Sequence, residues 1–235
     1  MMQENDKRLL ISGAQIIDGS GSKPFLGNII VLGDRIESVT KGSKLPQKIE
    51  NLKNTIDAKN LTVMPGLIDA HCHITFDEPS SNDELFFHRR ESLSAIIAGR
   101  NAFKVLQSGV TSFFDADSIF DVGVDLRDAI EAGIIAGPRM AVGGNALLTS
   151  VGGTAGRLIP DEGRRGYGAV VRNPDEIILE IRRQIKLGVD WIKIHVSGLV
   201  PRQFTEGEMK AWSLEELKTA CETAHDLGIP VVGHC

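Results

Sequence analysis

The chain reads Val63-Met64-Pro65-Gly66-Leu67-Ile68-Asp69-Ala70-His71-Cys72-His73 in the segment that decides its fold. A Pro-Gly pair interrupts the chain just before an apolar run, which favours a strand that begins at Leu67. Because side chains alternate between the two faces of a strand, His71 and His73 point the same way. Neutral imidazole is the commonest metal ligand in proteins, so this spacing predicts a metal site at a strand end.

Composition excludes several classes of function. The 235 residues include 26 lysines and arginines and 31 aspartates and glutamates, which gives a formal net charge of −5 at pH 7. This balance indicates no nucleic-acid surface. The segment Met1–Arg8 lacks the apolar core of a signal peptide, and no apolar run is long enough to span a bilayer. Cys72, Cys221 and Cys235 form no Cys-x-x-Cys pair. We therefore expect a cytoplasmic protein with free thiols that binds neither nucleic acid nor membranes.

Two patterns of secondary structure divide the chain. Before residue 64 the sequence reads as short strands and turns, with a strand at Leu9–Ile17 and a hairpin around Gly33-Asp34. From residue 64 onward strands and helices alternate, which favours βα units around a parallel sheet. We predict a small N-terminal module of β-sandwich type over residues 1–63 and an α/β domain over residues 64–235.

The α/β region contains five predicted strands and four predicted helices. The strands cover 67–73, 110–115, 138–143, 191–195 and 229–234, and the helices cover 83–107, 124–135, 174–188 and 214–227. Two helix starts are well marked, because Asn173-Pro174 is an N-cap followed by proline and Ser213–Glu216 is a capping box. Residues 144–172 are predicted to form a long glycine-rich loop. A complete eight-stranded barrel needs about 250 residues, so five such strands do not close one.

Further motifs follow the first strand in a characteristic order. They are Ser108–Asp115, Leu126–Arg139, Gly188–Ile194 and Ala224–His234. Together with the first segment they resemble the amidohydrolase superfamily, in the branch of Xaa-Pro dipeptidase-like, arginine carboxypeptidase-like and imidazolonepropionase-related enzymes. The resemblance implies a (β/α)8 TIM-like barrel, of which this chain has the first five strands. It also implies an N-terminal module that is normally completed by strands after the barrel.

The resemblance implies a set of metal ligands as well. His71 and His73 are similar to the ligands of the more buried metal, and His234 is similar to the first ligand of a second metal. Lys193 is similar to a lysine that becomes N-carboxylated and bridges the two ions. A buried lysine loses its proton readily, and the neutral amine can add carbon dioxide to form an anionic carbamate. Two divalent ions are expected, zinc by preference, although manganese, iron or cobalt suits the same ligands.

Two residues of the superfamily pattern have no counterpart in this sequence. They are a histidine at the end of the sixth strand and an aspartate at the end of the eighth, which serves as both ligand and general base. We therefore expect a truncated chain, or one completed by a C-terminal segment or a second polypeptide. Homo-oligomers are also expected, since members of the superfamily often form them.

Other residues are candidates for substrate contacts. His195 lies two residues beyond Lys193 and shares its face, where it is expected to touch substrate or to support a ligand. Tyr167, with Arg164 or Arg165, lies in the long loop and is expected to bind an acyl or carboxylate group of the substrate. The alternative for this loop is a solvated lid.

The leading interpretation is a hydrolase that cleaves the C–N bond of a small amide, dipeptide, carbamate or urea with a metal-activated hydroxide. One alternative is a mononuclear cyclic-amide hydrolase or deaminase, which does not need a carboxylated lysine. Another is a non-catalytic metal-binding fragment or half-barrel that requires a C-terminal partner. Carboxylation of Lys193 separates the first two interpretations, and hydrolysis by the isolated chain argues against the third.

Overall fold

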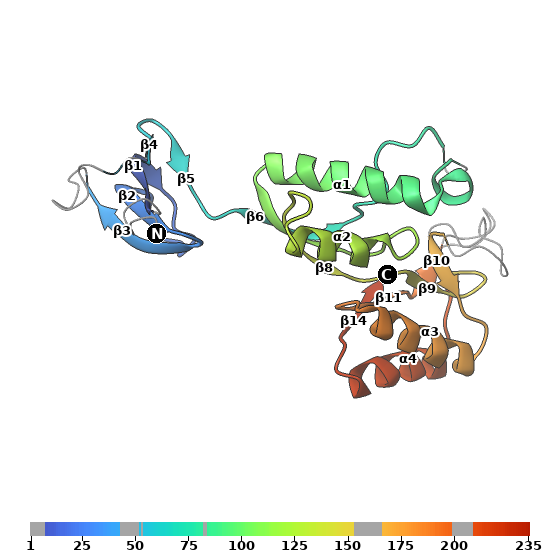
Figure 1. The fold of residues 1–235 in the computed structure, drawn as a ribbon. Helices are drawn as coiled ribbons and strands as arrows, with labels where there is room; N and C mark the ends of the chain where they lie inside the picture. The colour runs from blue at the N-terminus through green and yellow to red at the C-terminus, as the bar shows by residue number, and fades with distance from the viewer. Residues whose placement is uncertain (1–7, 43–51, 53, 82–83, 153–165, 199–208) are drawn as a thin grey trace. The chain divides into compact units, whose positions relative to one another are not determined.

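The structure is a computed structural model that describes residues 8–42, 52, 54–81, 84–152, 166–198 and 209–235 (Figure 1). Contacts within the chain separate it into two units, Met1–Gly66 and Leu67–Cys235. Each unit has its own sheet system and its own buried cluster, and each is described by itself.

The N-terminal unit contains one five-stranded sheet. Its strands are β1 (Arg8–Ile16), β2 (Phe25–Leu32), β3 (Arg35–Lys41), β4 (Thr55–Asp57) and β5 (Thr62–Val63). The order is β3-β2-β1-β4, with β5 also paired to β1. The predicted hairpin is confirmed, since β2 and β3 pair antiparallel and Gly33 turns between them with φ 61°. The described strands form a single sheet, so the second layer of a sandwich is not present among them.

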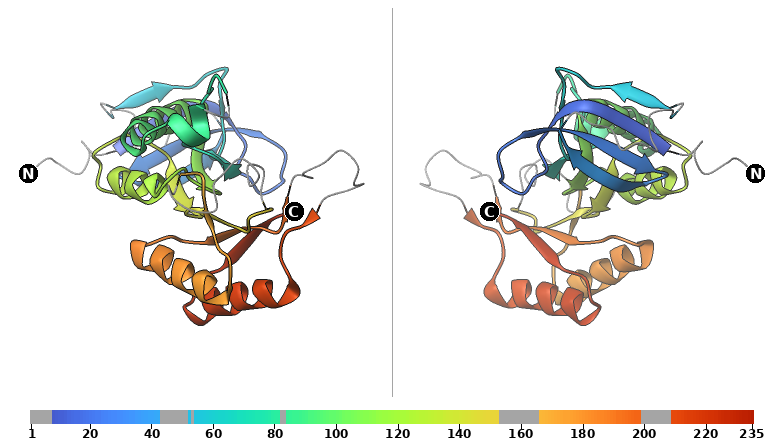
Figure 2. Two further views of the ribbon diagram at one scale, coloured as in Figure 1. Left: turned by 90° about the vertical axis from the view of Figure 1, so that its right-hand side faces the viewer. Right: turned by 90° about the vertical axis from the view of Figure 1, so that its left-hand side faces the viewer.

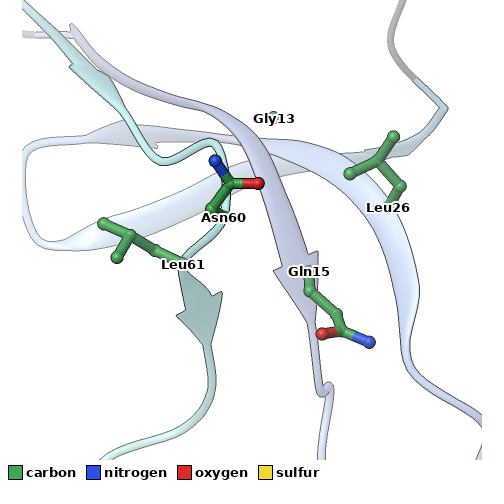
Figure 3. Close-up of a pocket in the computed structure, with 5 residues that line it drawn as sticks. All are labelled: Gly13, Gln15, Leu26, Asn60 and Leu61. Carbon is green, nitrogen blue, oxygen red and sulfur yellow. The ribbon is translucent and has the colours of Figure 1, made fainter.

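A small pocket of about 290 Å³ lies on this sheet. It is lined by Gly13 and Gln15 of β1, Leu26 of β2, and Asn60 and Leu61 of the turn before β5 (Figure 3). The backbone of Asn60 is left-handed, with φ 65°, a conformation that asparagine tolerates. None of these five lining residues is charged, so the pocket supplies no group for acid–base chemistry.

The C-terminal unit alternates strands and helices. Its elements are β6 (Leu67–Cys72), η2 (Glu84–His88), α1 (Glu91–Gln107), β7 (Val110–Asp115), α2 (Val122–Glu131), β8 (Arg139–Val142), β9 (Ala146–Leu148), β10 (Gly168–Val170), α3 (Pro174–Leu187), β11 (Ile192–His195), β12 (Ser197–Gly198), β13 (Met209–Lys210), α4 (Leu214–Asp226) and β14 (Val231–His234). Two parallel sheets, β6-β7-β8 and β10-β9-β11-β14, contain most of the strands. The two sheets are joined at Val142, whose carbonyl accepts from Asp190 N at 2.9 Å and from Trp191 N at 3.1 Å.

The predicted α/β class with parallel strands is confirmed. The main strands follow one another as β6, β7, β8, β11 and β14, which is the order of consecutive βα units. Helices α3 and α4 lie side by side next to β11 and β14 (Figures 1 and 2). Ile192 and Ile194 of β11 are buried in the same apolar cluster as Ile177 and Ile181 of α3. The described strands do not close into a barrel, because β6 and β14 do not pair with each other.

The long helix predicted over 83–107 is two elements, η2 and α1, with a break at residues 89 and 90. The side chain of Arg89 is buried, and its guanidinium donates to the carbonyls of Thr75 at 2.9 Å and Phe76 at 2.7 Å. It also donates to the carboxylate of Glu84 at 3.0 Å. A buried cation requires such partners, and two of the acceptors, the carbonyls of Thr75 and Phe76, lie in the segment before η2. The break therefore lies where tertiary contacts hold this side chain inside.

The long loop predicted over 144–172 contains two strands, so that prediction was wrong in part. β9 pairs with β11 through Leu147 and Ile194, and β10 pairs with β9 over three residues. Leu147 and Leu148 are fully buried. Because these pairings join residues far apart in the chain, no local signal in a glycine-rich stretch indicates them.

The N-cap at the start of α3 can be tested by mutation. Asn173 has an extended backbone, and its side-chain oxygen accepts from Glu176 N at 3.0 Å. We expect Asn173→Ala to lower the free energy of unfolding by about 1 kcal/mol, because the substitution removes this N-cap. Urea denaturation measures the change. Asn173→Ser retains a capping oxygen and should stay near wild type; equal stability of all three proteins would contradict the assigned cap.

Candidate active site

The predicted site residues lie at the carboxyl ends of the parallel strands. His71 is on β6 and His73 follows it, while Lys193 and His195 end β11 and His234 ends β14. The register of β11 and β14 places His195 directly opposite His234. In α/β proteins the carboxyl ends of parallel strands form the edge where ligands bind. The fold therefore gathers residues from three strands, far apart in the sequence, at one edge.

Lys193 is the most unusual member of this group. It is fully buried, with a relative exposure of 0%. Among the residues that the structure describes, its Nζ has no hydrogen-bond partner. Burial lowers the pKa of this amine, and the carboxylate of Asp117 opposes that shift only in part. An amine in this environment is more easily neutral than an ordinary lysine, which is the form that reacts with carbon dioxide.

The histidines form two pairs of rings. The ring centroids of His71 and His73 are 5.1 Å apart, and those of His195 and His234 are stacked at 4.8 Å. Burial lowers the pKa of His71, and the nearby Lys193 and His73 lower it further. A lowered pKa favours the neutral imidazole, which is the form that binds metals.

Asp117 joins these pairs and was not predicted from the sequence. It is 1% exposed and lies just after β7. One of its carboxylate oxygens is 2.9 Å from His73 Nδ1, and the other is 3.0 Å from His195 Nε2. Burial alone would raise the pKa of Asp117, but the hydrogen bonds with His195 and His73 hold it well below its ordinary value. Conversely, burial would lower the pKa of His73, and the contact with Asp117 raises it.

A signal for Asp117 was present in the sequence. Asp115 and Asp117 are two residues apart after an apolar strand, the same spacing as His71 and His73. The first of these carboxylates ends the motif Ser108–Asp115, and the second lies just beyond it. Spacing alone does not reveal that its partners are histidines from two other strands.

Asp115 is also fully buried, but it is bound differently. Its carboxylate accepts from Ile74 N at 3.0 Å and from the hydroxyl of Ser118. Burial raises the pKa of Asp115 to about 7, and these hydrogen bonds offset only part of that effect. Gly123 packs against the same groups, and a Cβ at this position would collide with Ser118 and with Asp115. This carboxyl group therefore holds the loop after β7 against the segment that follows His73.

Tyr167 lies beside the site in an aromatic cluster. It is 3% exposed, and its ring lies 4.6 Å from that of Phe86 and edge-on to His195 at 5.9 Å. Phe76 belongs to the same cluster and stacks on His73 at 4.6 Å. The other two residues predicted to bind substrate, Arg164 and Arg165, lie outside the described residues. The described part of the loop thus contributes an aromatic wall next to the two histidines bound by Asp117.

A groove of about 530 Å³ runs across the parallel strands of this unit. Its lining includes Ile68, His71, Phe114, Arg139, Trp191 and Val232. These residues come from β6, β7, β8 and β14 and from the start of β11, so the groove follows the sheets from strand to strand. His71 belongs to both the groove and the strand-end cluster, which connects the two.

The donor set can be compared with the needs of a metal ion. Within the described ranges, no three His, Cys, Asp or Glu side chains form a group that could hold one. His71 of β6 and His73, which follows it, nevertheless lie at the same strand ends as the amine of Lys193, which has no hydrogen-bond partner among the described residues. A lysine contributes oxygen ligands only after carboxylation, so the residues fit a divalent ion on the condition that Lys193 is modified.

The fold and these strand ends define an α/β protein of parallel βα units with a histidine- and lysine-containing site. Comparison with known families is consistent with this description. The amidohydrolase family matches residues 62–235, and the chain belongs to that family.

Individual relatives cover nearly the whole chain. An ochratoxinase of Aspergillus niger is 29% identical over 238 residues, covering 93% of this chain and 48% of its own length. The structure of a Xaa-Pro dipeptidase with bound methionine is 28% identical, with a TM-score of 0.78 over 97% of this chain and 56% of its own. A putative prolidase from Bifidobacterium longum is 29% identical, with a TM-score of 0.70 over 97% and 49%. The chain therefore spans about half the length of these relatives.

The described helices were also compared with the needs of a membrane span. None of them is both long enough and apolar enough to cross a bilayer.

Asp115 makes a prediction about stability and pH. Its pKa in the folded chain is about 7, above the ordinary aspartate value of 3.8, so the folded state binds the proton more tightly than the unfolded state. As the pH rises from about 4 to about 7, the free energy of unfolding of the wild type should therefore fall relative to that of Asp115→Asn, by an amount on the order of a few kcal/mol. Urea denaturation of both proteins across this range measures the difference.

Asp125→Asn is the matched control, because Asp125 is an exposed carboxylate on α2. Its stability relative to wild type should vary little over the same pH range. A difference between wild type and Asp115→Asn that does not depend on pH would contradict the raised pKa of Asp115.

Proposed function

We propose that this chain is the N-terminal part of a metal-dependent amidohydrolase that hydrolyses a C–N bond in a small amide, dipeptide, carbamate or urea. The observation that carries the proposal is the buried amine of Lys193, which has no hydrogen-bond partner among the described residues and lies at the strand ends where the histidines lie. A buried amine without a partner is unfavourable for folding, so its presence indicates a role in function. Membership of the amidohydrolase family and the similarity to a dipeptidase support a C–N bond as the target.

In this proposal His71, His73 and His234 hold two divalent ions, with Lys193 bridging them as a carbamate. Zinc suits imidazole and carbamate ligands, and manganese, iron and cobalt are the other candidates. When bound, such ions lower the pKa of water and polarise the substrate carbonyl. Carboxylation of the neutral Lys193 amine forms a bond between Nζ and the carbon of carbon dioxide and releases one proton, so a neutral amine is replaced by an anionic carbamate.

Other residues of the chain are assigned to orientation and to substrate contacts. His195 is held by Asp117 and stacked on His234, which suits a residue that touches substrate or supports a ligand. Tyr167, Phe76 and Phe86 form an apolar wall beside His73 and His195. We assign to this wall the exclusion of water and contact with an apolar part of the substrate, with Arg164 or Arg165 assigned to a carboxylate or acyl oxygen.

The proposal includes a C-terminal segment that completes the site. The relatives are about twice as long as this chain, and the groove along β6, β7 and β8 exposes apolar side chains that include Ile68. An exposed apolar groove of this kind suits contact with further protein. We assign the missing ligand and general base to that segment, and we expect the whole protein to act in the cytoplasm as a homo-oligomer.

Modification of Lys193 is the test of the proposal. We expect wild-type protein supplied with zinc and bicarbonate to bind two zinc ions per chain. Native mass spectrometry should show an additional mass equal to one carbon dioxide. Lys193→Met should lose that mass and at least one ion. Without zinc and bicarbonate, Lys193→Met should unfold at a higher urea concentration than wild type, because an apolar side chain replaces a buried amine that has no partner among the described residues.

Lys186→Met is the matched control, since Lys186 is exposed on α3. It should retain both ions and the carbon dioxide adduct. Equal metal content in wild type and Lys193→Met, with no adduct in either, would refute the bridged binuclear site. One zinc ion per wild-type chain without carboxylation would instead favour a mononuclear cyclic-amide hydrolase or deaminase.

A further inference from the structure

Asp117 is not one of the proposed metal ligands, so the proposed function does not account for its position. Its carboxylate is almost completely buried, yet it belongs to a loop rather than to a strand. Its two oxygens contact histidines that are separated by more than a hundred residues of sequence. His73 follows β6, and His195 ends β11. One side chain thus links the ends of two strands that do not pair with each other.

The chemistry of these contacts fixes where the protons lie. An ionised carboxylate only accepts hydrogen bonds, so each ring nitrogen that faces Asp117 carries a proton. In His73 this nitrogen is Nδ1, which lies 2.9 Å from one carboxylate oxygen and 3.3 Å from the backbone carbonyl of Asp117. In His195 it is Nε2, at 3.0 Å from the other oxygen. The two histidines are therefore held as opposite tautomers by one residue.

In its neutral form each ring then has one nitrogen with a free lone pair. For His73 this is Nε2, the nitrogen that a strand-end ligand presents to a metal when Nδ1 is bound to a carboxylate. For His195 it is Nδ1, which is buried and has no hydrogen-bond partner among the described residues. A lone pair buried without a donor is rare in proteins, and it usually marks a place for a ligand or an ion.

We propose that Asp117 is a positioning residue that fixes the tautomers and ring orientations of His73 and His195. It holds Nε2 of His73 and Nδ1 of His195 as acceptors. The purpose of this arrangement rests on the proposed function, in which His73 binds a metal ion and His195 faces the substrate or a ligand. The assignment of the tautomers rests only on the contacts of Asp117.

The surroundings of the two rings support a positioning role. His73 is stacked on Phe76, with ring planes 12° apart, and His195 is stacked on His234, with planes 15° apart. Stacking restricts tilting of a ring, but it leaves open which of the two flipped orientations the ring takes. The contacts with Asp117 supply that choice, because a flip would remove the donor of His195 from the carboxylate and the donor of His73 from the backbone carbonyl of Asp117 and its nearby carboxylate oxygen.

A purely structural role is the competing explanation. Asp117 would then hold the loop after β7 against β6 and β11, and the tautomers would have no consequence. Asp115 already binds that loop through Ser118 and Ile74 N, so loop attachment does not require a second buried carboxylate. The two explanations differ in whether loss of the carboxylate changes the histidines while the fold is retained.

The experiment compares wild type, Asp117→Asn, Asp117→Ala and the exposed-site control Asp125→Asn. Long-range proton–nitrogen correlation spectra report the tautomer of each histidine, and His73→Gln and His195→Gln variants assign the signals. We expect Nδ1–H for His73 and Nε2–H for His195 in wild type and in the control. In Asp117→Ala the His195 tautomer should become a mixture, and the preference of His73 for Nδ1–H should weaken but persist, because the hydrogen bond of Nδ1 to the backbone carbonyl of residue 117 remains. Asp117→Asn has one acceptor oxygen in its side chain, so that side chain can hold the tautomer of only one of the two rings.

Zinc affinity is measured on the same four proteins by competition with a chromophoric chelator. We expect the two Asp117 variants to bind zinc about 10- to 100-fold more weakly than wild type, the usual effect of losing a carboxylate that orients a histidine ligand. Asp125→Asn should match wild type. Circular dichroism and urea denaturation establish that the variants are folded, and Asp117→Asn, which keeps the size of the side chain, serves if Asp117→Ala unfolds.

The outcomes separate this inference from the proposed function. Unchanged histidine tautomers in folded Asp117 variants would overturn the positioning role, even if the wild type binds zinc. Tautomers that depend on Asp117 in a wild-type chain that binds no zinc would support the positioning of the rings and refute the proposed metal site. Tautomers and zinc affinity that change together would support both.

Discussion

The alternation of side chains along β11 is the constraint on which the site depends. Ile192 and Ile194 are buried in the apolar cluster that also includes α3 residues, so Lys193 and His195 must face the other way. The requirement for an apolar outer face thus places two polar residues in the interior, whatever their solvation cost. Pairing in register with β14 then brings His234 against His195. The alternation of side chains along β11 therefore determines both which residues pack against the helices and which residues face the site.

Three buried polar residues at these strand ends differ in their hydrogen-bond partners. Asp117 has two imidazole partners, and Asp115 has a hydroxyl and a backbone amide. Lys193 has no partner among the described residues. Buried polar groups in folded proteins are nearly always hydrogen-bonded, and each of the two aspartates accepts at least one hydrogen bond. Among the described residues at these strand ends, Nζ of Lys193 and Nδ1 of His195 have no hydrogen-bond partner, and the lysine is the residue whose neutral form is reactive.

The sequence predicted the features that depend on neighbouring residues. The hairpin at Gly33, the cap at Asn173 and the strand that carries Lys193 all have local signals, and the structure contains each of them. The break at Arg89 and the role of Asp117 were not predictable in this way. Asp117 contacts a histidine 78 residues further along the chain, and only the folded arrangement of β7 and β11 brings the two together. Long-range polar contacts leave no periodic pattern in the sequence.

The burial of the strands explains why His73 and His71 are not equivalent. β11 has neighbours on both sides, β9 and β14, and is fully buried, whereas β6 pairs only with β7 among the described strands and is largely exposed. Exposure leaves the ring of His71 with little to fix its direction. His73 is instead held by Asp117 and Phe76, both within the described part of the unit. The half of the site built around Asp117 is thus organised by strands that are already in place, while the position of His71 depends on whatever covers β6.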